Sequence, residues 1–185
     1  EIYSSKIDSF GYDDCPGHPV WMEPCEWLGS KLSKKHPLHL ITNQPKTRLH
    51  SQYDNGGCSL KSKISGREPV SINPIDAAHR GITNGDIVRI FNHRGTCLAG
   101  AIVTDDVMPN VVQISTGAWF DPLIPGKTGS LDVHGNPNVL TIDKGTSKLA
   151  QGPSAMSALV EVELFKDDLP PIKIFTPPEV QDEPK

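Results

Sequence analysis

Several features that mark large classes of proteins are missing from this sequence. Basic residues do not exceed acidic ones, because 18 Lys and Arg stand against 22 Asp and Glu and the formal net charge is −4. Proteins that bind nucleic acids need a clear basic surplus, so we expect no nucleic-acid partner. No run approaches the ~18 consecutive apolar residues that a membrane-spanning helix requires, so we expect no membrane insertion.

The short motifs of common enzyme classes are also missing. The 185 residues contain no Walker A sequence, no G-x-G-x-x-G after a strand and no G-x-S-x-G turn. The seven histidines show no H-x-x-x-H or H-E-x-x-H spacing. The four cysteines, at positions 15, 25, 58 and 97, match no zinc or disulfide framework. We therefore predict free thiols, no metal-binding residues and no catalytic residues in this chain.

What the chain does contain is a series of short β-branched runs between turn signals. Strands are predicted at residues 38–42, 68–74, 85–92, 96–104, 110–116, 138–142 and 158–165, with helical turns over 74–82 and a loop over 53–59. The sequence has 16 Gly and 17 Pro, which indicates abundant turns. Many short strands with one short helix predict a mainly β protein, a closed barrel that crosses over itself.

The pattern divides the chain into three parts. Residues 1–36 form an irregular leader and linker, in which "EIYSSKI" alternates like a short strand. The leader begins without a methionine or a signal peptide, so we expect the chain to belong to a longer protein. Residues 37–166 form the predicted barrel. Residues 167–185 form a proline-rich tail that should be extended, packed on a neighbour or disordered.

Three polar stretches carry more functional side chains than ordinary turns need. They are "QPKTRLHSQ" (44–52), "HGNPNVLT" (134–141) and "KGTSKLAQGPS" (144–154). Asn and Gln offer a donor and an acceptor side by side, which suits the edge of a heterocycle, while Arg and Lys suit phosphate. Together the stretches predict a pocket for a nucleotide-like ligand with a ring system and a diphosphate.

Taken singly, each stretch also has an ordinary structural explanation. Asn136 before a proline is a common turn initiator. Thr146 or Ser147 could cap a short helical turn. His50 could be a structural histidine, and Arg48 could form an ordinary surface ion pair. The residues alone leave both interpretations open.

Four blocks of sequence, in the same order, resemble a known family. They are "HPLHLITNQPKTRLHSQ", "REPVSINPIDAAHRGITNGDIVRIFNHRGTCLAGAIVTDDV", "STGAWFDP" and "HGNPNVLTIDKGTSKLAQG". The blocks look like the C-terminal cofactor-binding domain of the dimethyl sulfoxide reductase family of molybdoenzymes. Within it they are most similar to trimethylamine-N-oxide and biotin sulfoxide reductases. The resemblance runs from about His36 to about Phe165.

The resemblance implies a double-psi β-barrel that binds a bis(molybdopterin guanine dinucleotide) molybdenum cofactor. The complete enzyme would remove an oxygen atom from an S-oxide or N-oxide of the trimethylamine N-oxide, dimethyl sulfoxide, biotin sulfoxide or methionine sulfoxide class, in bacterial anaerobic respiration. The serine that binds molybdenum lies in an earlier domain of the family, so we expect this chain alone to lack both activity and cofactor.

The same resemblance implies partners and a compartment. The partners are the remaining domains of the same enzyme and a cytochrome or reductase that donates electrons. Some relatives work in the periplasm and others in the cytoplasm, and we expect the periplasm.

By position in the matching blocks, the resemblance also assigns cofactor contacts. The assigned residues are Gln44, Arg48, His50, Ser51, Asn136, Asn138, Gln151 and Gly152. Gln44 stands where the family often has histidine, and an amide cannot take a proton as an imidazole can. Trp119 is expected either to wall the cofactor or its access route, or to pack in the core.

Two other hypotheses come from different classes. A free-standing barrel could be a protein- or peptide-binding module, which should expose an apolar patch. A self-contained barrel enzyme would need a nucleophile or metal set that the sequence does not show. Convergence of Arg48, His50, Asn136 and Gln151 on one concave face would favour the cofactor hypothesis, and their scatter over opposite sides of the barrel would contradict it.

Overall fold

A computed structural model describes residues 2–177, and its strands follow the sequence pattern closely. In chain order the elements are α1 Ser5–Asp8, the 3-10 helix η1 Lys31–Lys34, β1 Leu38–Ile41, α2 Gly57–Ser62, β2 Pro69–Ile72, α3 Pro74–His79, β3 Ile87–Phe91, β4 Thr96–Val103, β5 Val111–Ile114, the 3-10 helices η2 Pro137–Val139 and η3 Ala155–Ser157, and β6 Ala158–Leu164. Within the described residues, no helix has the length and apolar character to cross a membrane.

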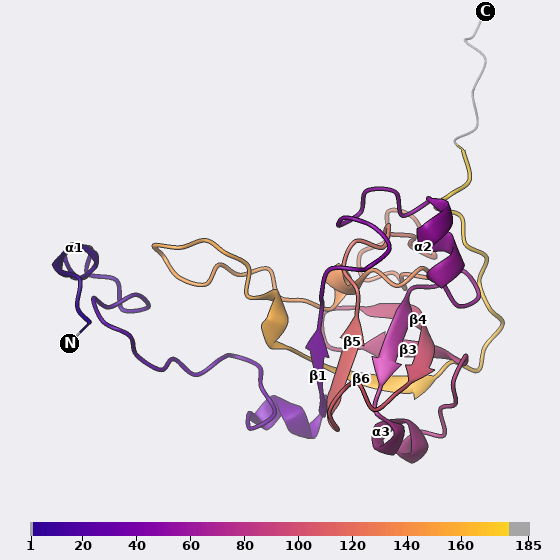
Figure 1. Ribbon diagram of the computed structural model, residues 1–185, viewed down its shortest axis with the longest axis horizontal. Helices are drawn as coiled ribbons and strands as arrows, with labels where there is room; N and C mark the ends of the chain where they lie inside the picture. Colours follow the sequence, from indigo (N-terminus) through magenta and orange to yellow (C-terminus); the bar gives the residue numbers. More distant parts are fainter. Residues whose placement is uncertain (1, 178–185) are drawn as a thin grey trace, which may run out of the picture.

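The strands close into a barrel in the order β1-β5-β2-β4-β3-β6 (Figure 1). The pairs β1–β5 and β2–β4 are parallel, and the remaining neighbours are antiparallel. Parallel neighbours require crossover connections rather than tight hairpins. The chain therefore passes over the barrel ends, and the prediction of a mainly β, self-crossing double-psi barrel is confirmed.

The core of the barrel comes from the alternation of side chains along its strands. In β2 and β5 every second residue is buried, as the period of two requires. The inward-facing side chains include Leu38, Leu40, Val70, Ile72, Val88, Ile90, Val112, Ile114, Val160 and Val162. The helix α3 also forms as predicted, with Asn73 as its N-cap and Pro74 at its first position.

Two strand predictions were wrong, and in both places a capping residue starts a short helix instead. Residues 138–142 do not form a strand, because the Asn136 side chain accepts a hydrogen bond from the Asn138 N–H at 3.0 Å and opens η2. Near the N-terminus, the Ser4 hydroxyl accepts from the Ile7 N–H at 3.3 Å and opens α1. Local capping outweighs the apolar alternation in these segments.

Two loop predictions also need correction. The segment 53–59 was predicted as a loop, but its last residues begin α2 at Gly57. No helical turn follows Thr146 and Ser147, which belong to a hairpin closed by a bridge between Gly145 and Pro153. The Ser147 hydroxyl does accept a backbone N–H, that of Ala150 at 2.8 Å.

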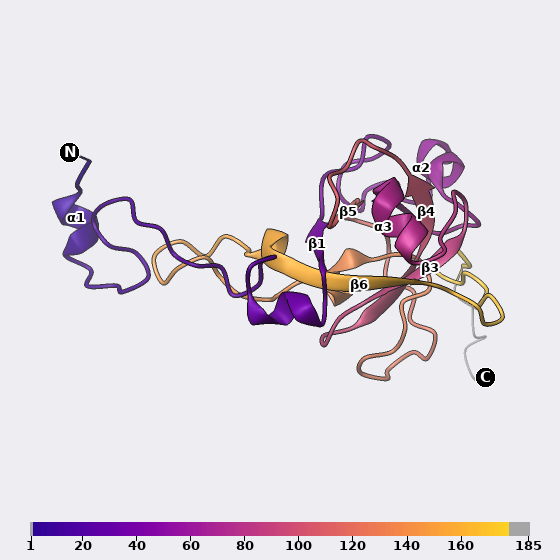
Figure 2. The same cartoon turned by 90° about the horizontal axis from the view of Figure 1, so that it is seen from below.

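Two segments far apart in the sequence extend together from the barrel. The leader with α1 and the loop 143–154 run side by side in both views (Figures 1 and 2). The Lys148 N–H donates to Asp14 at 3.1 Å, which ties the two segments together. Glu26 anchors the leader on the barrel, because its carboxylate pairs with Arg94 and accepts the Leu159 N–H at 2.8 Å. We call these two segments the arm.

Candidate functional site

The loop 44–52 forms an exposed polar surface at one end of the barrel. The Gln44 amide nitrogen lies 2.7 Å from His50 Nδ1, and its oxygen accepts the His50 N–H at 3.2 Å. His50 has a φ of 50° and Tyr53 a φ of 59°, in the left-handed region that non-glycine residues rarely adopt. Such conformations persist where the surroundings enforce them, and they often occur at functional sites.

The surroundings that hold this loop are buried charges. The Arg48 guanidinium is fully buried and donates to the carbonyl oxygens of His50 at 3.1 Å and Thr116 at 2.9 Å. It also forms an ion pair with Glu68 at 3.1 Å. Arg48 is therefore not a surface residue, and its side chain fixes the backbone of the loop from below.

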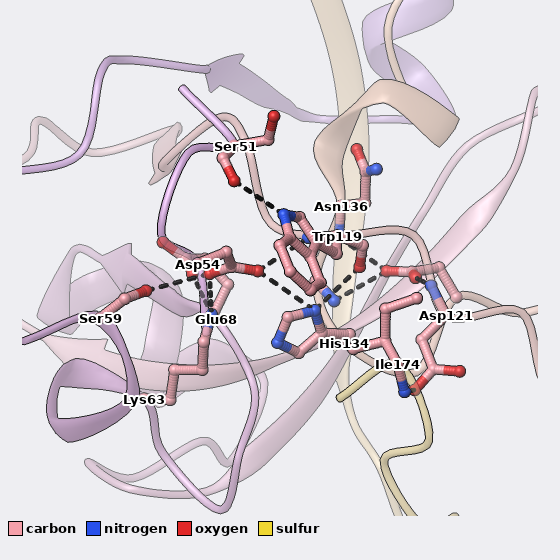
Figure 3. Close-up of polar contacts among 12 residues, drawn as sticks. Ser51, Asp54, Ser59, Lys63, Glu68, Trp119, Asp121, His134, Asn136 and Ile174 are labelled. Atoms are coloured by element: carbon pink, nitrogen blue, oxygen red, sulfur yellow. Dashed lines mark hydrogen bonds and ion pairs between the residues drawn. The ribbon is translucent and has the colours of Figure 1, made fainter. Parts of the chain in front are cut away.

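Lys63 and Asp54 complete the same buried group of charges (Figure 3). The Lys63 ammonium lies 2.8 Å from Asp54 and 2.9 Å from Glu68, and all three side chains are at least 97% buried. Burial would raise the pKa of Asp54, but the hydrogen bonds from Lys63 and from the Trp119 N–H lower it below its usual value. A fully buried carboxylate thus stays ionised because two cations and an N–H compensate its charge.

Trp119 and His134 connect this group to the second polar stretch (Figure 3). The Trp119 indole N–H donates to the Ser51 carbonyl at 2.7 Å, and its backbone N–H donates to Asp54 at 2.9 Å. His134 Nδ1 lies 2.8 Å from the Trp119 carbonyl, which can only accept, so Nδ1 carries the proton. Burial lowers the pKa of His134, which keeps the ring neutral, and its buried Nε2 has no partner among the described residues.

Asp132 shapes the turn that carries the second polar stretch. One of its oxygens accepts the N–H groups of Gly135 at 2.7 Å and Asn136 at 2.6 Å. The other accepts the Asp121 N–H at 2.8 Å. In Figure 3 the Asn136 side chain points to the same side of the network as Ser51. The fully buried Asp132 thus presents the start of η2 toward the end of the barrel where the loop 44–52 lies.

The described part of the tail packs against Asp121, Trp119 and His134. Asp121 accepts the N–H groups of Lys173 at 2.7 Å and Ile174 at 3.0 Å. These bonds hold Phe175 against Trp119 and His134, with ring centroids 5.5 and 5.0 Å apart. Residues 167–177 are therefore irregular, with 173–175 held against the barrel, while residues 178–185 of the predicted tail lie outside the described residues.

The third polar stretch is not at this end of the barrel. Gln151 and Gly152 are exposed residues of the loop 143–154 in the arm, where Gln151 donates to the Ser147 carbonyl at 2.7 Å and the Thr146 N–H donates to the Gly152 carbonyl at 2.8 Å. The structure therefore brings together Gln44, Arg48, His50, Ser51 and Asn136, with Asn138 two residues further along η2. It does not place Gln151 and Gly152 beside them.

A polar cavity of about 530 Å³ adjoins the loop 44–52 on the barrel side. Its lining includes Asn43, Lys46, Thr47, Glu68, Ser71 and Gln113, but not the exposed Gln44, His50 or Ser51. Among the described residues no group of three or more His, Cys, Asp or Glu is placed to hold a metal ion, and all four cysteines are free. The donors present are amides, an imidazole and hydroxyls, which suit a heterocyclic nucleotide.

Residues 38–159 match the family model described as "Molydopterin dinucleotide binding domain". The chain belongs to this family. The match covers the whole barrel up to the start of β6, including all three polar stretches, and the prediction from the four sequence blocks is confirmed. The cofactor class of this family, a molybdopterin dinucleotide, fits the amide- and hydroxyl-rich surface described above.

Individual relatives agree with the family assignment. The molybdopterin dinucleotide-binding chain is 50% identical over 180 residues to "Dimethyl sulfoxide/trimethylamine N-oxide reductase" of Cereibacter sphaeroides, covering 96% of the chain and 22% of the relative. It is 52% identical over 167 residues to "Trimethylamine-N-oxide reductase 1" of Escherichia coli K12, covering 89% of the chain and 20% of the relative. The chain thus spans about a fifth of the length of these curated relatives.

A solved structure supports the fold independently. The structure of acetylene hydratase from Pelobacter acetylenicus superposes with a TM-score of 0.71 over 89% of the chain and 23% of that structure, at 19% sequence identity. At this identity the likeness concerns the fold alone.

Sequence reasoning missed the residues that build the base of the site. The side chains of Asp54, Lys63, Glu68 and Asp132 are buried, yet none of these residues stands in a sequence motif that marks a buried charge. The partners in these ion pairs do not share one helix or strand, so no periodic pattern or motif marks them. Only Glu68, directly before the apolar β2, carried a weak signal of its burial.

Proposed function

We propose that this chain is the C-terminal part of a larger molybdenum reductase, in which it binds a molybdopterin guanine dinucleotide. The family match and the reductase names of the relatives support this role. The division into a leader (1–36), a cofactor-binding barrel (37–166) and a tail (167–185) belongs to the same proposal. It is supported by strands that begin at Leu38 and end at Leu164.

The proposed reaction of the larger protein is the reduction of an S-oxide or N-oxide. The relatives are named for dimethyl sulfoxide and trimethylamine N-oxide, and biotin or methionine sulfoxide belongs to the same chemical class. The bound cofactor would supply the redox centre that accepts the oxygen atom. We further propose that the protein serves bacterial anaerobic respiration in the periplasm and receives electrons from a cytochrome or reductase.

Within this function, the residues of the chain bind and orient rather than react. Gln44, His50 and Ser51 offer exposed donors and acceptors to the cofactor, and Arg48 holds their backbone from below. The start of η2, with Asn136 and Asn138, adds amides from the neighbouring turn.

Gln151 and Gly152 are exposed on the arm, so we propose that they contact cofactor where further parts of the larger protein enclose the arm. The exposed side chains of the leader, including Val20, Trp21 and Met22, are consistent with such an enclosure.

The observation that carries the proposal is the contrast within the loop 44–52. Apart from Leu49, its exposed side chains are polar, whereas its base is a buried group of charges. Burying charges is costly, and a solvated loop has no need of it. A rigid base under an exposed polar surface is the arrangement that pre-organises a binding site.

The test compares the complete protein with the 185-residue chain. The complete protein should contain molybdenum, release GMP on acid hydrolysis and oxidise reduced methyl viologen when trimethylamine N-oxide is added. The chain alone should show none of these three properties. A complete protein that is folded but contains neither molybdenum nor GMP would contradict the proposal.

A further inference from the structure

Asp54 lies between two groups of contacts that belong to different polar stretches. It is fully buried, and its Oδ1 accepts a hydrogen bond from the Ser59 hydroxyl at 3.0 Å. The Lys63 ammonium lies 2.8 Å from the same oxygen. Arg48 Nε lies 3.5 Å from the same oxygen. This side of the carboxylate is therefore connected to α2 and to the base of the loop 44–52.

The second oxygen of Asp54 faces the other stretch. It accepts the Trp119 N–H at 2.9 Å and lies 3.7 Å from His134 Nδ1 (Figure 3). Trp119 reaches back to the Ser51 carbonyl through its indole, and its carbonyl accepts the His134 Nδ1–H. Asp54 and Trp119 together thus connect the loop 44–52, at Arg48 and Ser51, with the turn 132–138, at His134.

The backbone at this junction leaves little freedom. Gly117 has a φ of +88°, and a Cβ there would overlap the His50 carbonyl. Gly135 has a φ of +102°, and a Cβ there would lie 2.7 Å from the Glu68 Cβ. Both close approaches require glycine. The segment at Gly117 is therefore packed directly on the backbone of the loop 44–52, and the turn at Gly135 directly on Glu68. A displaced Asp54 would disturb both contacts.

We propose that Asp54 is a positioning residue of the cofactor site, whose carboxylate fixes the loop 44–52 relative to the turn 132–138. This inference rests on the proposed function for the identity of the ligand. The coupling of the two segments is a property of the chain itself, and each part can be measured separately.

The test uses two substitutions of the same chemical type. Asp54→Asn keeps the size of the side chain but turns one acceptor into a donor, so either the Trp119 N–H or the Lys63 and Ser59 donors lose their partner. Asp86→Asn is the matched control. Asp86 also accepts two hydrogen bonds, from the Thr83 N–H at 2.7 Å and the Thr83 hydroxyl at 2.8 Å, in the turn between α3 and β3.

The first measurement is amide hydrogen exchange in the 185-residue chain. In D54N, exchange should become about tenfold faster or more in residues 44–52 and 132–138, with the strands changing far less. D86N should leave both segments unchanged. Ser59→Ala, which removes one contact of Asp54, should give a smaller acceleration of about two- to threefold in the same segments. Acceleration spread evenly over all strands in both D54N and S59A would overturn the positioning role.

The second measurement is the GMP released by acid hydrolysis per complete protein. D54N should retain less than about a third of the wild-type GMP, while D86N should retain wild-type content, because a mobile loop loses pre-organised binding. Wild-type GMP content in D54N would overturn the positioning role and leave the proposed function standing. Absence of GMP from the wild-type complete protein would instead overturn the proposed function.

Discussion

The end of the barrel and the arm both carry residues that the sequence assigned to cofactor binding, but they are held in opposite ways. At the barrel end, Arg48 contacts Thr116 and Glu68, which lie far from it in the chain. In the hairpin of the arm, Gln151 bonds to Ser147, four residues away. Long-range buried contacts fix a geometry within the chain, whereas an exposed local hairpin depends on what surrounds it. The geometry of the barrel end is therefore fixed within the chain, whereas that of the hairpin in the arm depends on its surroundings.

The largest test of this comparison removes a buried charge from one region and an exposed charge from the other. Arg48→Ala leaves the buried carboxylates of Asp54 and Glu68 with a cation missing, so the free energy of unfolding should fall by about 3–5 kcal/mol. Lys148→Ala in the exposed arm should change it by less than about 0.5 kcal/mol. Urea denaturation of both variants measures the difference, and equal effects would show that the barrel end is not selectively locked.

A pair of glycines gives the next test. Gly117→Ala combines a left-handed φ with overlap of the His50 carbonyl, so the free energy of unfolding should fall by about 2–3 kcal/mol. In Gly152→Ala the new Cβ would lie 3.7 Å from the Thr146 hydroxyl, an ordinary contact. The free energy of unfolding should therefore fall by less than about 1 kcal/mol. Thermal and urea unfolding measure both. A loss in G152A as large as that in G117A would mean that the arm is as tightly constrained as the barrel end.

The smallest expected effect is a pH dependence of the free energy of unfolding that arises from Asp132 at the barrel end. Burial raises the pKa of Asp132 to about 6, although four backbone N–H groups oppose the shift. The native state therefore holds the proton more tightly than the unfolded state. The contribution of Asp132 to stability is fully present below about pH 4 and is lost as the pH rises through about 6.

The measurement is the free energy of unfolding between pH 4 and 7 in the wild type and in Asp132→Asn. The variant lacks this titration, so the difference between the two curves should change by about 1–2 kcal/mol across that range. A carbon NMR titration of the Asp132 carboxyl should show its midpoint near pH 6. Parallel stability curves would contradict the expected titration.

Much of the fold could be predicted because a β-strand shows itself in a short stretch of sequence, through alternating apolar residues between turn residues. The alternation in β2 and β5 and the proline start of α3 are visible without a structure. The failures at residues 138–142 and at α1 came from single capping side chains, Asn136 and Ser4, which outweigh short apolar patterns. A cap acts through one hydrogen bond, so a composition-based prediction easily overlooks it.

The candidate site was predicted only in outline. The polar stretches were found because they contain unusual numbers of amides and cations, and their family resemblance is confirmed by the match over residues 38–159. Which side chains face outward could not be predicted. Arg48 looked like a ligand-binding or surface residue, yet its guanidinium is fully buried. The assignment of the eight residues to cofactor contacts stays a prediction.

The barrel, the family and the three polar stretches could be predicted from the sequence, because side-chain periodicity, turn residues and motif order are local properties. The fold places two stretches at one end of the barrel and the third on the arm. It also brings Asp54, Lys63 and Glu68 into one buried group. Charges enter a protein interior only in compensated groups, and compensation depends on contacts between residues that the fold, not the local sequence, brings together.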